Sequence, residues 1–312
     1  MNIPQDKIQD FQKKILDWYK LYRRDLPWRK TRDPYKILVS EVMLQQTQVS
    51  RVLPKYEAWC KKFPTMQSLA CAKTSEVLHV WSGLGYNRRA LNLQKCVQAI
   101  LQLNAKRLRS TAKSEEAMGD EAVVWPRTEK ELLALPGIGK YTARALLCFA
   151  FDEQVAVVDT NVKKVIMTNI MKKELRTKDE MDHNSYFLFH DAVLESSRTL
   201  SEKELWEIAE ALVPPGRAYD WNQALMDYAS AVLKHERIPI PKQSKFIGSR
   251  RYYRGKILKL LLKKNEIMIS DLGPLVRDDY TDKNKTWLEA LLKELAQEGF
   301  IDYDIKTVRL RQ

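Results

Sequence analysis

The chain has 312 residues, of which 45% are hydrophobic and 30% are charged, and this balance predicts a folded protein of about two domains. No apolar run is long enough for a membrane span and no secretory leader follows Met1, so we expect an intracellular, cytoplasmic protein. Its 53 Lys and Arg residues exceed its 40 Asp and Glu residues by 13, which indicates a polyanionic partner such as nucleic acid or an anionic membrane surface.

The chain divides into a long helical portion and a short mixed one. Over residues 1–234 the apolar residues recur at helical spacing between prolines, and no alternating strand pattern is present. Residues 235–249 contain two prolines and a basic bias, which is typical of a linker. Residues 250–312 predict three helices and then a strand hairpin, a winged-helix-like order. We therefore expect an all-α fold with a small α+β module, whose helices lie at 253–264, 270–276 and 284–298.

Glu41 lies within an otherwise apolar helical stretch. A lone glutamate in such a helix is more often a solvated position than a catalytic acid. If this helix faces a cleft, however, the loss of water would raise the pKa of Glu41 and keep its carboxyl protonated. Glu41 is therefore a candidate proton donor.

Residues 135–142 read L-P-G-I-G-K-Y-T between two helical stretches. Gly137 and Gly139 allow a tight turn whose backbone N–H groups can approach a phosphate at the start of the next helix, beside Lys140. A bare G-x-G is more often an ordinary turn between helices, but the full string in a basic protein favours a helix–hairpin–helix motif. Such a hairpin binds the DNA backbone without reading its sequence.

Asp159 ends the apolar run 155–158 and opens the next helix. Most acids at such a position serve only as the N-cap. The helix N-terminus would also stabilise an ionised carboxylate and lower the pKa of Asp159. A protonated Glu41 and an anionic Asp159 would form a pair suited to cleavage of a glycosidic bond.

Six strings occur in the order seen in MutY-type adenine DNA glycosylases, and the chain resembles this family over residues 8–234. The resemblance implies the fold of the helix–hairpin–helix glycosylase superfamily, with two helical lobes and a cleft between them. The strings are LPWR (26–29), SEVMLQQTQV (40–49), WSGLGY (81–86), LPGIGKYT (135–142), VDTN (158–161) and WNQALMD (221–227).

The resemblance assigns roles to residues of the site. Glu41 matches the acid that protonates the departing adenine, and Asp159 matches the carboxylate that stabilises or captures the sugar cation. Asn161 matches the catalytic-site asparagine of the family. Tyr141 stands where lyase members keep a nucleophilic lysine, and Lys140 is one position early, so we expect hydrolysis by water without efficient strand cleavage.

Five further residues match positions that contact the flipped base or the duplex. Trp28, Arg29 and Gln223 match the base pocket. Gln46 and Tyr86 match residues that wedge into the duplex where the base has left it, which offsets part of the unstacking cost. Each also has an ordinary interpretation, as a core aromatic, a phosphate-facing arginine or a surface helix residue.

The chain departs from the family at two places. Family members carry four cysteines for an iron–sulfur cluster after the stretch that matches 227–233, whereas no cysteine follows Cys148 here. Because the ligands of such a cluster must be thiolates, we expect no iron–sulfur cluster. We also expect no bound metal among the site residues, although the hairpin is a candidate site for a monovalent cation. Residues 250–312 also do not resemble the family's C-terminal domain that recognises 8-oxoguanine.

The sequence predicts a monofunctional, monomeric DNA glycosylase of base excision repair, associated with the nucleoid and not with a membrane. It would flip a mispaired base out of double-stranded DNA, adenine opposite 8-oxoguanine or guanine, and leave an abasic site. One alternative is a glycosylase for thymine or uracil opposite guanine, which Tyr141 also permits. An alternative of another class is a catalytically inactive protein that has kept the fold for DNA binding.

Overall fold

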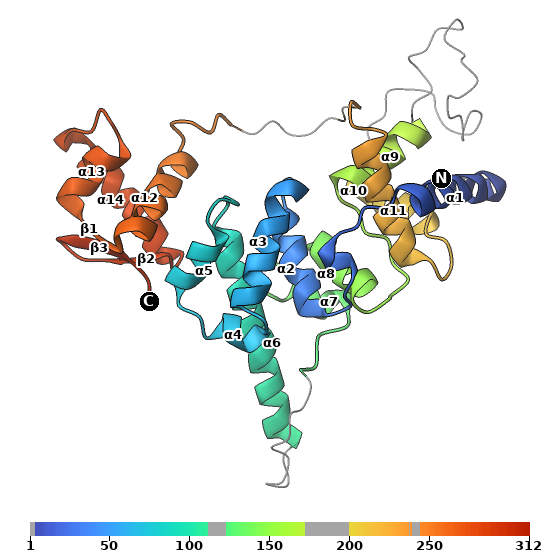
Figure 1. Cartoon of the computed structure of the whole chain (residues 1–312), viewed down its shortest axis with the longest axis horizontal. Helices are drawn as coiled ribbons and strands as arrows, with labels where there is room; N and C mark the ends of the chain where they lie inside the picture. Colours follow the sequence, from blue (N-terminus) through green and yellow to red (C-terminus); the bar gives the residue numbers. More distant parts are fainter. Residues whose placement is uncertain (1–3, 112–122, 172–199, 237, 239–243) are drawn as a thin grey trace, which may run out of the picture. The chain divides into compact units, whose positions relative to one another are not determined.

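We describe the chain from a computed structural model, in which residues 4–111, 123–171, 200–236, 238 and 244–312 are described (Figure 1). The helices before the linker are α1 (Gln5–Tyr22), η1 (Pro27–Arg29), α2 (Pro34–Leu44), α3 (Val49–Lys62), α4 (Met66–Ala70), α5 (Thr74–Trp81), α6 (Arg88–Thr111), α7 (Glu129–Leu133), α8 (Lys140–Phe149), α9 (Thr160–Met171), α10 (Glu202–Ala211) and α11 (Ala218–Ala231). Described residues up to 236 contain no strand, which confirms the all-helical prediction for this portion. None of the helices in the described ranges has the length and apolarity that a membrane crossing requires.

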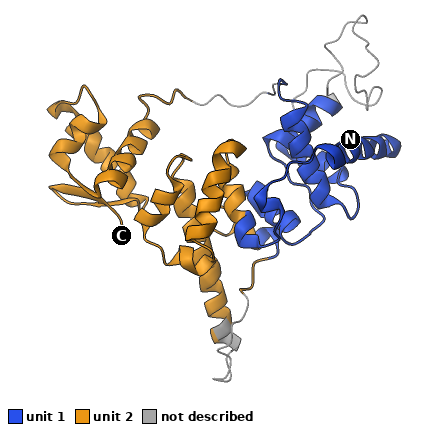
Figure 2. Ribbon diagram, in the orientation of Figure 1, with its two compact units in different colours: residues 1–37, 127–130, 139–240 blue, residues 38–126, 131–138, 241–312 orange. Residues whose placement is uncertain are grey.

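The chain forms two compact units, and both draw on separate parts of the sequence (Figure 2). Unit 1 contains residues 1–37, 127–130 and 139–240, and unit 2 contains residues 38–126, 131–138 and 241–312. Each unit thus assembles from segments that are distant in the sequence.

Unit 1 is built around the pairing of its first helix with α11. The apolar residues of α1 recur every three or four positions and place one buried stripe against the core. Phe11 of this stripe meets Trp221 of α11 edge to face, with ring centroids 5.6 Å apart. Helices α9 and α10 complete the same core, and Ser201 and Glu204 form a capping box that begins α10.

Before its C-terminal segment, unit 2 consists mainly of α3, α4, α5 and α6. The indole of Trp59 is fully buried and packs edge to face against Phe63 and Trp81, at centroid distances of 5.0 and 5.6 Å. Gln94 of α6 donates two hydrogen bonds to carbonyls at the end of α4, which ties these helices together.

The C-terminal segment of unit 2 is winged-helix-like, as the sequence predicts. Its sheet is antiparallel with the order β1-β3-β2, and Ile267 of β1 pairs with Val308 of β3. The predicted helices and the final hairpin are present, whereas β1, a strand of three residues, was not expected. The elements are α12 (Arg250–Lys264), β1 (Glu266–Met268), α13 (Ile269–Val276), η3 (Asp282–Asn284), α14 (Lys285–Gln297), β2 (Ile301–Tyr303) and β3 (Thr307–Leu310).

This segment packs directly on the helices of unit 2. Leu78 of α5 and Leu91 of α6 belong to the same buried cluster as the apolar residues of α12, α14 and the sheet. At its edge, Glu298 accepts charged hydrogen bonds from both Arg88 and Arg254. Burial alone would raise the pKa of Glu298, but the two guanidiniums lower it below its ordinary value.

Candidate functional site

The predicted hairpin is present, with α7 before the turn and α8 after it. Gly137 has a φ of +77°, and a Cβ there would lie 2.7 Å from the Cβ of Asn92, so both the backbone and the space require glycine. Gly139 is the N-cap of α8 and supplies no side-chain acceptor to its first turn. Lys140 and Tyr141 are the first residues of α8, which places them at the end of a helix that favours an anion.

Lys140 also has a neighbour within the protein. Its ammonium lies 4.1 Å from the centroid of the Trp206 ring, a cation–π contact, although the side chain as a whole is exposed. The residue can therefore serve a phosphate or stay on Trp206.

Asp159 caps α9, the helix that it opens. Its carboxylate accepts a hydrogen bond from the backbone N–H of Val162 at 2.7 Å and another from the amide of Asn161 at 2.7 Å. These donors favour the ionised form, but burial outweighs them and the pKa of Asp159 is raised above its ordinary value. The expected lowering of this pKa was therefore wrong, because the helix N-terminus does not compensate for the lost water.

Asn222 holds the extended segment that leads to Asp159. Its amide oxygen accepts from the N–H of Val157 at 2.8 Å, and its amide nitrogen donates to the carbonyl of Val155 at 2.9 Å. Arg144 donates to the intervening carbonyl of Ala156 at 2.8 Å. Sequence reasoning missed this role of Asn222. The only available signal was its place in the string WNQALMD.

Two of the predicted base-pocket residues, Trp28 and Gln223, are buried, with exposed fractions of 6% and 5%. The third, Arg29, forms a bidentate ion pair with Asp227, with both N–O distances 2.8 Å. Its side chain is 9% exposed and that of Asp227 only 1%. The guanidinium of Arg29 is thus largely buried and held by Asp227, a residue of α11.

The Arg29–Asp227 pair keeps both of its members charged. Burial alone would lower the pKa of Arg29 and raise that of Asp227. Their mutual hydrogen bonds and charges reverse both effects, so the pKa of Arg29 lies above and that of Asp227 below its ordinary value. Arg24 adds a third hydrogen bond from its side chain and a fourth from its backbone. No pattern in the sequence linked these residues.

Glu41 lies in α2 and is 4% exposed, so it is not a solvated helix position. Its neighbours Ser40 and Val42 are also buried. A carboxyl group at such a position has lost its water, which is the setting that a proton donor for a nucleobase requires.

Gln46 and Tyr86, the predicted wedge residues, are both exposed and both have a left-handed backbone. Their backbone φ angles are +54° and +47°, values that residues other than glycine rarely adopt. Tyr86 exposes 45% of its surface, a large fraction for an aromatic residue. Strained, exposed residues of this kind are concentrated at functional sites.

Comparison with known proteins gives a consistent result for most of the chain. A profile of the family described as "HhH-GPD superfamily base excision DNA repair protein" matches residues 39–185. The adenine DNA glycosylase of Rattus norvegicus is 36% identical over 81% of this chain, which spans only 44% of that relative's length. The adenine DNA glycosylase of Mycolicibacterium smegmatis is 35% identical, and the match covers 79% of this chain and 78% of that relative.

Solved structures show the same fold. A thermostable thymine-DNA glycosylase has 29% sequence identity and a TM-score of 0.54, over 78% of this chain and 92% of that one. An endonuclease III trapped in a covalent intermediate with DNA has 17% identity and a TM-score of 0.51, over 73% of this chain and 86% of that one. The second likeness concerns the fold alone.

Proposed function

The chain belongs to the HhH-GPD superfamily of base excision DNA repair proteins, and we propose that it is a monofunctional glycosylase that hydrolyses the N-glycosidic bond of a mispaired adenine in double-stranded DNA. The observation that carries the proposal is the capped, partly buried carboxylate of Asp159 beside Asn161, in a chain that matches adenine DNA glycosylases through that segment. The relatives from Rattus norvegicus and Mycolicibacterium smegmatis are both adenine DNA glycosylases.

In the proposed reaction, the buried carboxyl of Glu41 gives its proton to a ring nitrogen of the flipped base. The glycosidic bond then breaks, and its electron pair leaves with the base. The carboxylate of Asp159 stabilises the positive charge that develops on the sugar. Water adds to the sugar carbon and loses a proton, which leaves an abasic site. Because a nearby positive charge lowers the pKa of a carboxyl group, the sugar cation itself favours the ionised form of Asp159.

Tyr141 supports a hydrolytic enzyme rather than a lyase. A Schiff base with the sugar requires an amine at the reacting carbon. The residue at this point of α8 is a phenol, and the ammonium of the adjacent Lys140 lies over the ring of Trp206. We therefore expect borohydride to trap no covalent complex between this protein and DNA.

The test is base release from a panel of duplexes with adenine opposite 8-oxoguanine, adenine opposite guanine, thymine opposite guanine and uracil opposite guanine. Alkali after the reaction converts each abasic site to a strand break that a gel detects. We expect release from the adenine duplexes. The variants Glu41→Gln and Asp159→Asn should lose at least about 10³-fold in single-turnover rate and still bind the duplex, since the first removes the proton donor and the second removes the charge that stabilises the sugar cation. Cleavage of no member of the panel would refute the proposal, and a wild-type protein that binds without cleaving would indicate a DNA-binding role.

A second candidate is a glycosylase for thymine or uracil opposite guanine. It is favoured by the likeness to the thermostable thymine-DNA glycosylase, at 29% identity over most of the chain. The same panel distinguishes the two, because this candidate predicts release from the thymine and uracil duplexes and none from the adenine duplexes.

A further inference from the structure

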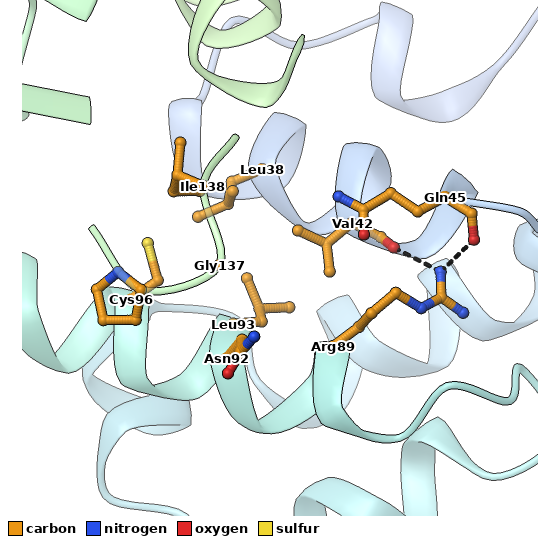
Figure 3. Close-up of a pocket in the computed structure, with 10 residues that line it drawn as sticks. Leu38, Val42, Gln45, Arg89, Asn92, Leu93, Cys96, Gly137 and Ile138 are labelled. Carbon is orange, nitrogen blue, oxygen red and sulfur yellow. Dashed lines mark hydrogen bonds between the residues drawn. The ribbon is translucent and has the colours of Figure 1, made fainter. Parts of the chain in front are cut away.

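Six oxygen atoms, from the end of α2 and from two separate turns, surround the guanidinium of Arg89. Its Nη1 donates to the carbonyls of Val42, Met43 and Gln45, at 2.8, 3.1 and 2.6 Å. Figure 3 shows this nitrogen between the carbonyls of Val42 and Gln45, at the wall of a cavity of about 40 Å³. Its Nη2 donates in addition to three oxygens of the turns 45–47 and 84–86: the Thr47 hydroxyl and the carbonyls of Leu84 and Gly85, at 3.2, 3.3 and 3.2 Å.

These two turns carry Gln46 and Tyr86, the exposed residues with left-handed backbones. Each of the two therefore sits within one residue of an oxygen that Arg89 binds. The guanidinium also lies 5.5 Å from the centroid of the Tyr86 ring. It serves the last carbonyls of α2 as well, which have no partner within their own helix.

Among the residues that the structure describes, no carboxylate pairs with Arg89, so the side chain makes these contacts as a charge without a counter-charge. Within the described part of the chain all of its hydrogen bonds go to carbonyls and one hydroxyl, and its Nε is buried without a partner there. Burial lowers the pKa of Arg89 to about 10, so the side chain stays protonated at neutral pH. A protein retains such an unpaired charge when its geometry is needed.

We propose that Arg89 is a positioning residue that fixes the 45–47 and 84–86 turns so that Gln46 and Tyr86 point outward together and enter the DNA when the base is extruded. The proposal rests on the glycosylase function proposed above. It follows from the fork of the guanidinium, because only a planar group with several fixed donors can serve both turns at once.

Arg89→Lys tests the proposal, since an ammonium keeps the charge but has three donors for six acceptors. Two substrates are compared: adenine opposite 8-oxoguanine, and the same adenine opposite a tetrahydrofuran abasic analogue, where it is already unpaired. We expect the single-turnover rate to fall by about tenfold or more on the paired substrate and by no more than about threefold on the unpaired one. The ratio of the two rates does not depend on how much of the variant is folded.

A second readout does not require catalysis. With 2-aminopurine in place of the adenine, fluorescence rises when the base leaves the stack, and we expect this rise for the wild type and not for Arg89→Lys.

Arg88→Lys is the matched control, because Arg88 directly precedes Arg89 in α6 but pairs with Glu298. This variant should keep the wild-type ratio and fluorescence. Thr47→Val removes a single acceptor of Arg89 and should shift the ratio in the same direction by about threefold, which provides a test if Arg89→Lys folds poorly.

The outcomes are distinct. An Arg89→Lys variant with the wild-type ratio and the wild-type fluorescence would overturn the proposal and leave Arg89 a purely structural residue. A wild-type protein that extrudes 2-aminopurine but releases no base would refute the glycosylase function. In that case the fluorescence of Arg89→Lys alone decides the role of Arg89: no rise supports it, and a wild-type rise overturns it. A wild-type protein that extrudes nothing would overturn the role of Arg89.

Discussion

Asp159 shows how a residue suited to catalysis is held at the expense of stability. Its carboxylate has two hydrogen-bond donors at 2.7 Å, yet burial raises its pKa. A carboxyl group whose pKa is higher in the folded than in the unfolded state makes folding less favourable once it ionises. The stability of the fold therefore decreases as pH rises from the unfolded-state pKa toward the raised folded-state pKa.

Asp159→Asn should for this reason stabilise the protein at pH 7 while it removes activity. Asparagine does not ionise, so the deficit disappears, and we expect the free energy of unfolding to rise by about 1 kcal/mol. Urea denaturation at pH 7 measures this gain, and the gain should shrink as the pH is lowered toward the unfolded-state pKa of aspartate, where wild type and variant become equivalent. A variant that is less stable than the wild type at pH 7 would contradict the burial argument.

Asp227 is the opposite case, because its ionised form supports the fold. Its pKa is lowered by Arg29 and Arg24 against the effect of burial. The stabilisation of the fold by ionised Asp227 is therefore present above the unfolded-state pKa and is lost as pH falls through the folded-state pKa.

Asp227→Asn leaves the guanidinium of Arg29 buried without a counter-charge, and we expect a loss of about 3 kcal/mol in the free energy of unfolding. Asp25→Asn, which affects an exposed pair with Lys30, should change it by less than about 0.5 kcal/mol. Equal losses for the two variants would show that the buried pair contributes no more than a surface pair.

At the scale of elements, the hairpin between α7 and α8 depends on two glycines for different reasons. Gly137 is left-handed and lies against Asn92, whereas Gly139 has a φ of −101° and open space where a Cβ would be. Gly137→Ala should therefore lower the free energy of unfolding by about 2 kcal/mol, from the backbone strain together with the clash. Gly139→Ala should lower it by only about 0.5 kcal/mol, because alanine is a poorer N-cap than glycine. Thermal unfolding of the two variants checks the order, and an equal effect would contradict the geometry at Gly137.

The elements also show what a sequence can reveal. The helices of the C-terminal segment could be predicted from local periodicity. The N-cap role of Asp159 could be predicted because it depends only on the residues next to it. Strand β1 was missed because three residues are too few to show alternation. The Arg29–Asp227 pair spans 198 residues, and the contacts of Arg89 join turns about 40 residues apart. Such pairings arise from packing across the fold, and nothing in the local sequence around either partner indicates them.

At the scale of the whole molecule, the net charge of +13 overstates the positive surface that DNA meets. Part of the basic side of α12 is neutralised within the protein. Arg250 and Arg254 pair with Glu294 of α14, and Arg254 also pairs with Glu298. The acidic residues that make α14 a poor candidate for reading a groove thus hold α12 in place. In the proposed complex with DNA, phosphate contacts would then come from other charges, and Lys140 of the hairpin is one candidate.

Lys140 is the side chain through which the hairpin would contact a phosphate. Binding to duplex DNA should weaken with salt, with a log–log slope of about −0.9 for each phosphate contacted. If Lys140 leaves the ring of Trp206 to contact a phosphate, Lys140→Gln should make that slope less steep by about 0.9 and weaken binding for every duplex sequence alike. Lys20→Gln, in which the lost lysine is exposed and paired with Asp17, should leave the slope unchanged. Fluorescence anisotropy at several salt concentrations measures both variants. An unchanged slope for Lys140→Gln, together with a lower melting temperature, would mean that Lys140 packs on Trp206 and contacts no phosphate.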